Sequence, residues 1–168
     1  MADGESVPRL VLISGATGVG KTTLAKAVAH EMGLARIASS DTIREVMRAT
    51  AGSSNPALNR SSYGRGDVGD PGTDWEDAAR AVEPGIDAVV ERARQQGVDL
   101  VLEGVHVIPS RRLLSAWETA GGAAVGIVVK IEDEGTHRER IEQREANTWR
   151  GAERYRIGFE RIRSIQRI

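Results

Sequence analysis

The chain alternates short apolar runs with longer stretches in which apolar side chains recur at helical spacing. Residues 10–13 read Leu-Val-Leu-Ile and end in a glycine-rich turn, which is the pattern of a strand buried on both faces of a parallel sheet. Residues 21–32 follow with apolar side chains four positions apart, and Gly33 stands where a helix would end. The opening therefore predicts a strand followed directly by a helix.

Three later segments have the length and apolar content of single strands: 36–39, 98–102 and 124–129. Ser40 or Asp41 can cap a helix after the first of them, and another helix is expected around residues 113–120. No Asn-Gly hairpin turn lies between these strands. Since helices join the strands, the sequence predicts an α/β fold with a mostly parallel sheet and helices on both of its faces.

Residues 51–75 have a different composition, because Gly, Ser, Asp, Asn and Pro dominate and few positions can be buried. Loops of this length in compact domains tend to be mobile lids or caps over a binding site, although an insertion without a role would look the same. We expect a flexible polar cap loop here. Residues 86–93 then follow a helical pattern, and Pro84-Gly85 is expected to break or restart that helix.

The chain has 168 residues, 40% of them hydrophobic, which is enough for one core and favours a single domain over residues 1–168. The net charge of −1 gives no general reason to expect nucleic acid or anionic lipid as a partner. The absence of cysteine excludes a disulfide framework and suits a reducing cytoplasm. The start MADGESVPR is not that of a signal peptide, and residues 10–13 are too few to cross a bilayer. We expect a cytoplasmic protein of unspecified oligomeric state.

The pattern Gly15-x-x-x-x-Gly20-Lys21-Thr22 lies between the first predicted strand and helix, which is the context that a phosphate-binding loop requires. Its glycines let successive backbone N–H groups point at a β-phosphate, and the helix N-terminus adds partial positive charge. Lys21 can contact the β- and γ-phosphates, and the Thr22 hydroxyl can ligate Mg²⁺. The predicted nucleotide-binding residues are Gly15, Ala16, Thr17, Gly18, Val19, Gly20, Lys21, Thr22 and Thr23.

The chain lacks the sequence signatures of several classes of nucleotide hydrolase. The chain has no Asn-Lys-x-Asp guanine-reading tetrapeptide and no Leu-Ser-Gly-Gly transporter signature. The strand over 98–102 runs into Glu103-Gly104 and not into the Asp-Glu pair usual in motor ATPases. A kinase that closes over a small acceptor fits a chain of this size better.

Asp41 is expected at the carboxyl end of the second strand, the edge where open α/β sheets bind ligands. Its carboxylate could accept the proton of an attacking hydroxyl, or it could simply cap the helix. Arg44 lies one turn further on and could bind an anionic acceptor, as could Arg48. Both arginines could equally belong to a solvated helix face.

Glu103 follows a buried strand, so we expect it at the carboxyl edge of the sheet, as for Asp41. There it could hold Mg²⁺ together with Thr22 or orient the nucleophile. His106 could bind a phosphate or carboxylate of the acceptor, or be satisfied by a backbone partner. Arg111 and Arg112 are further candidate anion contacts.

Residues 132–168 form an arginine-rich region, with nine arginines against five glutamates from residue 138 onward. Arg138 and Arg144, and with them Arg150 and Arg154, could form a lid that neutralises charge on a transferring phosphoryl group. Alternating Arg and Glu with apolar residues at helical spacing is also the pattern of an ordinary amphipathic helix pair.

The segments SGATGVGKTTLAKAVA, ASSDTIREVMR, LEGVHVIP, HRERIEQR and AERYRIGFERIRSIQ occur in this order along nearly the whole chain. Taken together they resemble the 2-phosphoglycerate kinase family. The resemblance implies a P-loop kinase fold and the ATP- and Mg²⁺-dependent phosphorylation of the 3-hydroxyl of 2-phosphoglycerate to 2,3-bisphosphoglycerate. A small anionic metabolite of this kind would suit Arg44, Arg48 and His106.

Two departures from the family pattern bear on this expectation. The segment GRGDVGDPGTD is richer in Gly and Asp than the family leads us to expect, so we expect an acceptor pocket that differs from that of the family. The second departure is that relatives continue beyond Ile168 with a further strand. A sheet without its last strand is therefore expected. A kinase for another hydroxyl acceptor, such as a sugar, antibiotic or nucleotide-sugar, and a non-catalytic ATP-binding regulatory module are the alternative functions.

Overall fold

The computed structural model of the chain describes residues 7–51, 54–146 and 153–168. Four strands form one parallel sheet in the order β2-β3-β1-β4. The strands are β1 (Arg9–Ser14), β2 (Ile37–Ser39), β3 (Leu100–Gly104) and β4 (Ala123–Val128). The parallel sheet with helices on both faces that the sequence predicts is confirmed.

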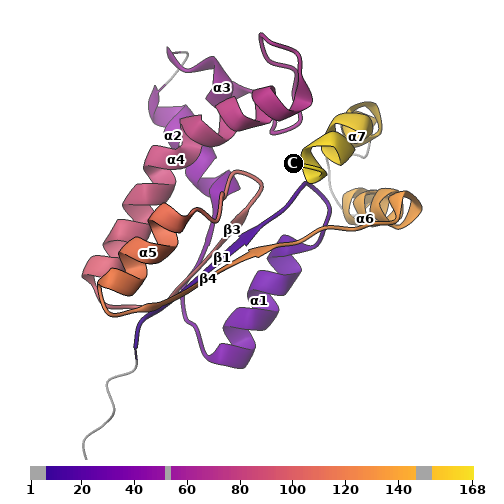
Figure 1. Cartoon of the computed structure of the whole chain (residues 1–168). Coiled ribbons are helices and arrows are strands. Elements are labelled where there is room, and N and C mark those ends of the chain that lie inside the picture. The colour runs from indigo at the N-terminus through magenta and orange to yellow at the C-terminus, as the bar shows by residue number, and fades with distance from the viewer. Residues whose placement is uncertain (1–6, 52–53, 147–152) are drawn as a thin grey trace, which may run out of the picture.

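Seven helices surround this sheet in the described part of the chain. They are α1 (Lys21–Met32), α2 (Ser40–Ala51), α3 (Pro56–Asn59), α4 (Pro71–Gln95), α5 (Arg111–Thr119), α6 (Glu134–Ala146) and α7 (Glu153–Gln166). Figure 1 shows α1 on one face of the sheet, α4 and α5 on the other, and α6 and α7 beyond the carboxyl ends of the strands. No helix among the described residues is long and apolar enough to cross a membrane.

Strand β1 is buried on both faces, which explains its unbroken apolar run. Leu10 and Leu12 belong to the core cluster formed with α4 and α5, whereas Val11 and Ile13 pack with α1. Because side chains alternate along a strand, these four residues anchor both helical layers.

Strand β3 begins later than the apolar run 98–102 suggests. Asp99 remains outside the strand, where its carboxylate accepts hydrogen bonds from the Arg9 backbone N–H at 2.7 Å and from the Arg9 guanidinium. The strand begins at Leu100 and ends at Gly104, so Glu103 is its last but one residue. At the other side of the sheet β4 pairs only with β1 among the described strands, and Val125 and Val128 are exposed on it.

The expectation that residues 51–75 form a polar loop is wrong for residues 56–59 and 71–75, which are helical. Helix α3 buries Leu58, and α4 already begins at Pro71. Both helices start with a polar cap followed by proline: the Asn55 side chain accepts the N–H of Ala57, and Asp70 accepts that of Thr73. Asn55-Pro56 and Asp70-Pro71, which suggested a loop, instead start helices.

The predicted break at Pro84-Gly85 is also wrong, since α4 is continuous through both residues. Proline inside a helix costs about 3 kcal/mol. Buried Val82 and Ile86 hold the helix on either side of it, and Gly85 leaves space that Ile43 and Met47 of α2 fill. Packing against the core and α2 outweighs the local preference of proline.

Candidate active site

Residues 15–20 join β1 to α1 and form the floor of the site. Gly20 lies at the N-terminus of α1 with φ of 98°, a conformation that residues with a side chain rarely adopt. Ala16 and Val19 are buried against α6 and α7. The loop is therefore anchored by β1 of the sheet at its start and by packing against the C-terminal helices α6 and α7.

The Lys21 ammonium lies inside this loop. Its Nζ donates a hydrogen bond to the carbonyl oxygen of Ala16 at 2.8 Å. Burial lowers the pKa of Lys21 to about 8; the charges of Glu103 and Asp41 raise it and that of Arg144 lowers it further. All three of those side chains are thus close enough to act on the ammonium, and a lysine with this pKa is still mostly protonated at pH 7.

The Thr22 side chain of α1 contacts the Glu103 side chain of β3. The Thr22 hydroxyl donates to Glu103 Oε1 at 3.1 Å, and Glu103 is buried opposite Ile13 of β1. A hydroxyl and a carboxylate are oxygen donors that suit Mg²⁺. The described residues contain no group of three or more His, Asp or Glu side chains that could hold a metal by themselves. A magnesium ion here would therefore need oxygens from a bound phosphate and from water as well.

Asp41 lies at the same edge of the sheet as Glu103. Ser39, the last residue of β2, pairs with Glu103, and Ser40 packs on Gly104 so closely that a Cβ atom at residue 104 would lie 1.8 Å from the Ser40 hydroxyl. The Ser39 hydroxyl accepts the N–H of Asp41 in the first turn of α2. The Asp41 side chain is 70% exposed, so its carboxylate is accessible to solvent.

His106 does not lie on the surface of this site. Its side chain is only 1% exposed, and its Nδ1 lies 3.4 Å from the Ser40 hydroxyl and 3.7 Å from Asp41 Oδ1. Burial lowers the pKa of His106 to about 4, so the ring is neutral at pH 7. The ring is thus buried beside Ser40 and Asp41, and a direct contact of His106 with an acceptor stays a prediction.

The two arginines of α2 have different surroundings. The Arg44 side chain is mostly buried, and its Nη1 donates to the carbonyl oxygen of Arg60 at 2.6 Å. Arg48 is half-exposed and pairs with Glu45 one turn before it, as on an ordinary solvated helix face. Arg112 pairs with Glu83 and Asp87 of α4, so it ties two helices together away from the loop.

Helix α6 packs directly on residues 15–20, which we call the phosphate loop. The Nε2 of His137 lies 2.8 Å from the carbonyl oxygen of Thr17, and a Cβ atom at Gly18 would collide with Ile141. Arg140 lies close to Gly20, with its Nη1 3.7 Å from the position that a Cβ atom at residue 20 would take.

The arginines predicted as lid residues divide between two faces of the helices. Arg144 is close enough to Lys21 to affect its pKa, and its guanidinium also pairs with buried Glu145. Arg138 is turned away from the loop and lies over the Phe159 ring at 4.0 Å. Arg154 lies over the Tyr155 ring, and Arg150 falls outside the described residues.

The sequence interpretation named neither His137, which contacts the loop, nor Arg140, which lies near Gly20. Both lie one helical turn before a residue on the same face, Ile141 and Arg144 respectively, whereas Arg138 points elsewhere. Helical spacing within HRERIEQR could have singled out Arg140 together with Arg144.

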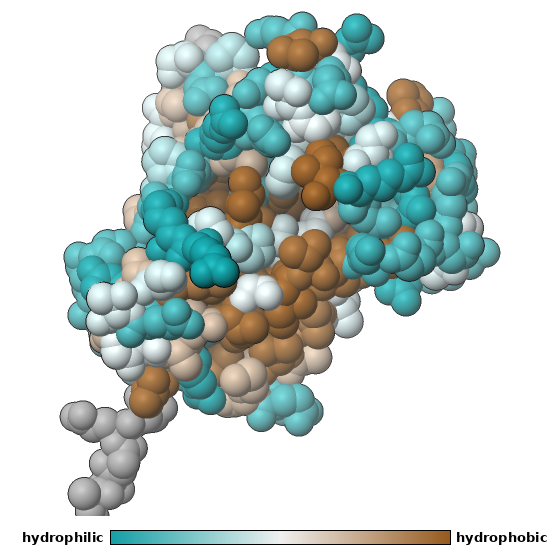
Figure 2. Space-filling model, in the orientation of Figure 1, coloured by the Kyte–Doolittle hydropathy of each residue, from teal (hydrophilic) through white to brown (hydrophobic). Residues whose placement is uncertain are grey.

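A cavity of about 430 Å³ lies beside the first residues of the loop. It is mainly apolar, and its walls include Gly15, Trp75, Val107, Val128 and Ile165. Figure 2 shows apolar surface along β4 that continues into this hollow. None of the charged residues predicted to bind an acceptor lines it, so this cavity is distinct from the space above Asp41.

Comparison with protein families gives one match over nearly the whole chain. Residues 10–166 match the family model described as AAA domain. The chain is also 37% identical to the 2-phosphoglycerate kinase of Methanopyrus kandleri, over 94% of this chain and 51% of that protein. It is 33% identical to the 2-phosphoglycerate kinase of Methanothermobacter thermautotrophicus, over 95% of this chain and 56% of that protein. The chain spans about half the length of the curated relatives it matches.

Solved structures share the fold. A Chloroflexus aurantiacus protein provisionally described as a kinase aligns with a TM-score of 0.53 at 22% identity, over 89% of this chain and 75% of that one. A chain of the PezAT toxin–antitoxin system of Streptococcus pneumoniae aligns with a TM-score of 0.52 at 16% identity, over 84% of this chain and 55% of that one. At these identities the likeness shows the fold alone.

Proposed function

Because the chain belongs to the family described as AAA domain and is similar to 2-phosphoglycerate kinases, we propose that it transfers the γ-phosphate of ATP to an alcohol. The proposed acceptor is the 3-hydroxyl of 2-phosphoglycerate, and the product is 2,3-bisphosphoglycerate. We also propose a small anionic metabolite as substrate and a cytoplasmic location.

On the donor side, residues 15–23 hold the triphosphate. The backbone N–H groups at the start of α1 face the β-phosphate, and Lys21 places its charge between the β- and γ-phosphates. Thr22 and Glu103 are the residues that would hold Mg²⁺, which neutralises phosphate charge when bound. Their contact at 3.1 Å supports this assignment, because it brings two oxygen donors together directly beside the loop.

On the acceptor side, Asp41 is the proposed general base. It would accept the proton of the attacking hydroxyl while the phosphoryl group moves. The observation that carries the proposal is the register that aligns Ser39 with Glu103, since it places the exposed Asp41 carboxylate at the same edge as Lys21 and Glu103. Asp41 also acts on the pKa of Lys21, which agrees with a short separation between base and phosphate site.

Positive charge around this space suits an acceptor with a phosphate and a carboxylate. Arg44 and Arg48 of α2 are the proposed acceptor contacts, and Arg44 is the better positioned of the two because it is partly buried beside Asp41. Arg144, helped by Arg140, is the proposed lid arginine that stabilises charge on the transferring group. We propose that the neutral His106 ring, whose Nδ1 lies 3.7 Å from Asp41 Oδ1, helps to position that carboxylate.

The test is ADP release from ATP and Mg²⁺ by the purified chain, with and without 2-phosphoglycerate. Release that depends on 2-phosphoglycerate and disappears in Lys21→Ala supports the proposal. Release that instead requires a sugar, an antibiotic or a nucleotide-sugar would retain the kinase assignment and replace the acceptor. Tight ATP binding without release for any acceptor would overturn it in favour of a regulatory module.

A further inference from the structure

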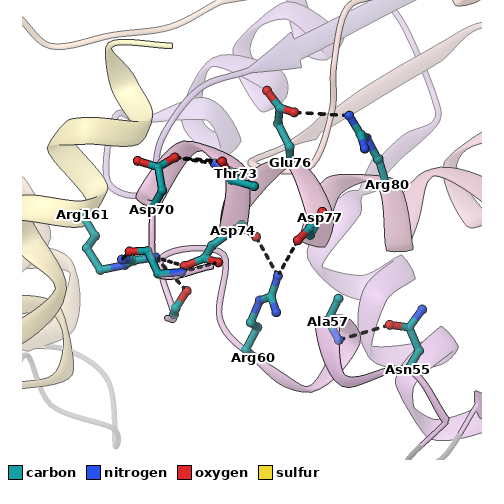
Figure 3. Close-up of polar contacts among 12 residues, drawn as sticks. Asn55, Ala57, Arg60, Asp70, Thr73, Asp74, Glu76, Asp77, Arg80 and Arg161 are labelled. Carbon is teal, nitrogen blue, oxygen red and sulfur yellow. Dashed lines mark hydrogen bonds and ion pairs between the residues drawn. The ribbon is translucent and has the colours of Figure 1, made fainter. Parts of the chain in front are cut away.

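Arg161 of α7 is bound to the segment that follows α3, which we call the cap segment (residues 60–70). Its Nε donates to the carbonyl oxygen of Tyr63 at 2.9 Å, its Nη1 to that of Gly69 at 2.8 Å and its Nη2 to that of Gly64 at 3.2 Å. Nη2 also lies 2.7 Å from Asp74 Oδ2 (Figure 3). One guanidinium therefore fixes the backbone of the cap segment at three places.

Asp74 completes this arrangement from the first turn of α4. Its side chain has no exposed surface, and its Oδ1 accepts the N–H of Gly69 at 3.3 Å. The backbone N–H of Gly66 and then the Arg161 guanidinium lower the pKa of Asp74, so the carboxylate is charged. A buried charge of this kind depends on its partner, because removing one member leaves the other uncompensated.

The same helix is also joined to the phosphate loop. Arg163, two residues after Arg161 and thus on the opposite side of α7, donates to the carbonyl oxygens of Ile131 at 2.7 Å and Glu132 at 2.9 Å. It also lies 3.4 Å from Nδ1 of His137, whose Nε2 lies 2.8 Å from the Thr17 carbonyl oxygen. Helix α7 is therefore connected on one side to the cap segment and on the other to the loop.

The cap segment in turn borders the acceptor space. The carbonyl oxygen of Arg60 accepts a hydrogen bond from Arg44, which lies one turn after Asp41. The Tyr63 ring packs on Tyr155 of α7, with ring centroids 5.5 Å apart. A shift of α7 would thus move the wall of the space in which the proposed acceptor binds.

We propose that Arg161 is a positioning residue, which holds the cap segment through Asp74 and couples its closure to nucleotide binding at the phosphate loop. In this proposal, nucleotide binding orders the phosphate loop. The contact of His137 with Thr17 and of Arg163 with His137 then orders α7. Arg161 of α7 in turn orders the cap segment, residues 60–70, through its hydrogen bonds. The reference to an acceptor rests on the proposed function, whereas the coupling between loop and cap segment does not.

Hydrogen exchange of the whole chain, with and without Mg²⁺ and a non-hydrolysable ATP analogue, tests the coupling without any turnover. We expect the analogue to slow exchange in residues 15–23 and also in residues 61–69. In Arg161→Met the first effect stays and the second disappears. Arg156→Met is the matched control, since Arg156 lies on the same helix with a side chain that is 59% exposed and pairs with exposed glutamates.

Two further variants keep the test decisive if Arg161→Met unfolds. Arg161→Lys keeps the charge but lacks the planar fork that reaches several carbonyl oxygens at once, so the exchange effect in residues 61–69 should fall by half or more. Asp74→Asn keeps one acceptor oxygen for two donors, the Gly69 N–H and Arg161 Nη2, so it should lose part of the effect and retain part of it. Unchanged nucleotide-dependent protection of residues 61–69 in any folded Arg161 variant would overturn the proposal.

Kinetics separate positioning from a merely structural role. Arg161→Met should raise the KM for the acceptor by roughly tenfold to a hundredfold, while the KM for ATP changes less than about twofold. Equal changes in both constants would overturn the positioning role. If the wild-type chain shows no acceptor-dependent ADP release, the proposed function fails, and the exchange measurement still decides the coupling by itself.

Discussion

The Nε2–H of His137 donates to the carbonyl oxygen of Thr17 at 2.8 Å, so helix α6 is hydrogen-bonded to the phosphate loop itself. A carbonyl oxygen only accepts, so the proton lies on Nε2, and Nδ1 is left to accept from Arg163. Burial lowers the pKa of His137, which keeps the ring in this neutral form. Movement of α6 away from the loop has to break this bond.

Replacing Lys21 with alanine should remove the charge that we propose contacts the β- and γ-phosphates. We expect ATP affinity to fall roughly tenfold to a hundredfold, because hydrogen bonds to charged groups contribute about 1.5–3 kcal/mol each. Titration calorimetry with an ATP analogue measures this. Lys26→Ala is the control, since Lys26 is exposed on the same helix. Near-normal affinity and turnover in Lys21→Ala would contradict the role assigned to this residue.

Asp41→Asn should separate binding from chemistry. Loss of a general base lowers the rate by roughly 10²-fold or more, whereas ATP affinity should stay almost unchanged because Asp41 does not form the phosphate loop. Single-turnover rates and ATP titration give the two numbers, with Glu118→Gln on the exposed side of α5 as control. Parallel losses of affinity and rate would show that Asp41 has a structural role.

The arginines of α6 should differ according to the face on which they lie. Arg144→Ala is expected to lower the rate at saturating ATP, and Arg140→Ala to do so together with a loss of ATP affinity, because Arg140 lies beside Gly20. Arg138→Ala should leave the rate intact and lower the free energy of unfolding by about 0.5–1 kcal/mol, through loss of its contact with Phe159. A rate defect confined to Arg138→Ala would reverse this assignment.

The buried histidines should make the fold sensitive to acid. His106 has its pKa lowered to about 4 by burial, below the value of about 6.5 for an unfolded chain. The neutral ring therefore stabilises the fold fully above about pH 6.5, and this contribution is lost as the pH falls toward 4, at up to about 1.4 kcal/mol per pH unit.

Guanidinium unfolding at several pH values between 7 and 4.5 measures this loss. His106→Asn should be less stable than the wild type at pH 7 and should show a shallower decline toward acid. His30→Asn, at an exposed position of α1, should follow the wild-type curve. Identical pH dependence in His106→Asn and the wild type would show that His106 does not titrate in this range.

The features that the sequence predicted well are those set by local patterns. The unbroken apolar run of β1, the glycine spacing of the loop and the helical spacing of α1 lie next to one another, so their order alone identifies the phosphate loop. Capping rules could also have located α3 and α4, since Asn55-Pro56 and Asp70-Pro71 both follow the pattern of a polar cap before proline.

Other features depend on contacts between distant residues. The continuity of α4 through Pro84 comes from packing against the core and α2, which no local rule reveals. The burial of His106 depends on how Ser40 meets Gly104, and the orientation of Arg138 on the position of Phe159. The conformation of residues 60–74 depends on Arg161, nearly a hundred positions later, which hydrogen-bonds to Tyr63, Gly69 and Asp74.

Strand β1 occupies an inner position in the sheet although it is the first element of the chain. Leu10 pairs with Leu100 on one side and with Ala124 on the other. Such distant pairing is associated with slow folding, because a long stretch of chain must close before the contacts form. During synthesis β1, which precedes the phosphate loop, consequently has no neighbouring strand to pair with until β3 has left the ribosome. Until then this apolar strand is available to chaperones and to aggregation.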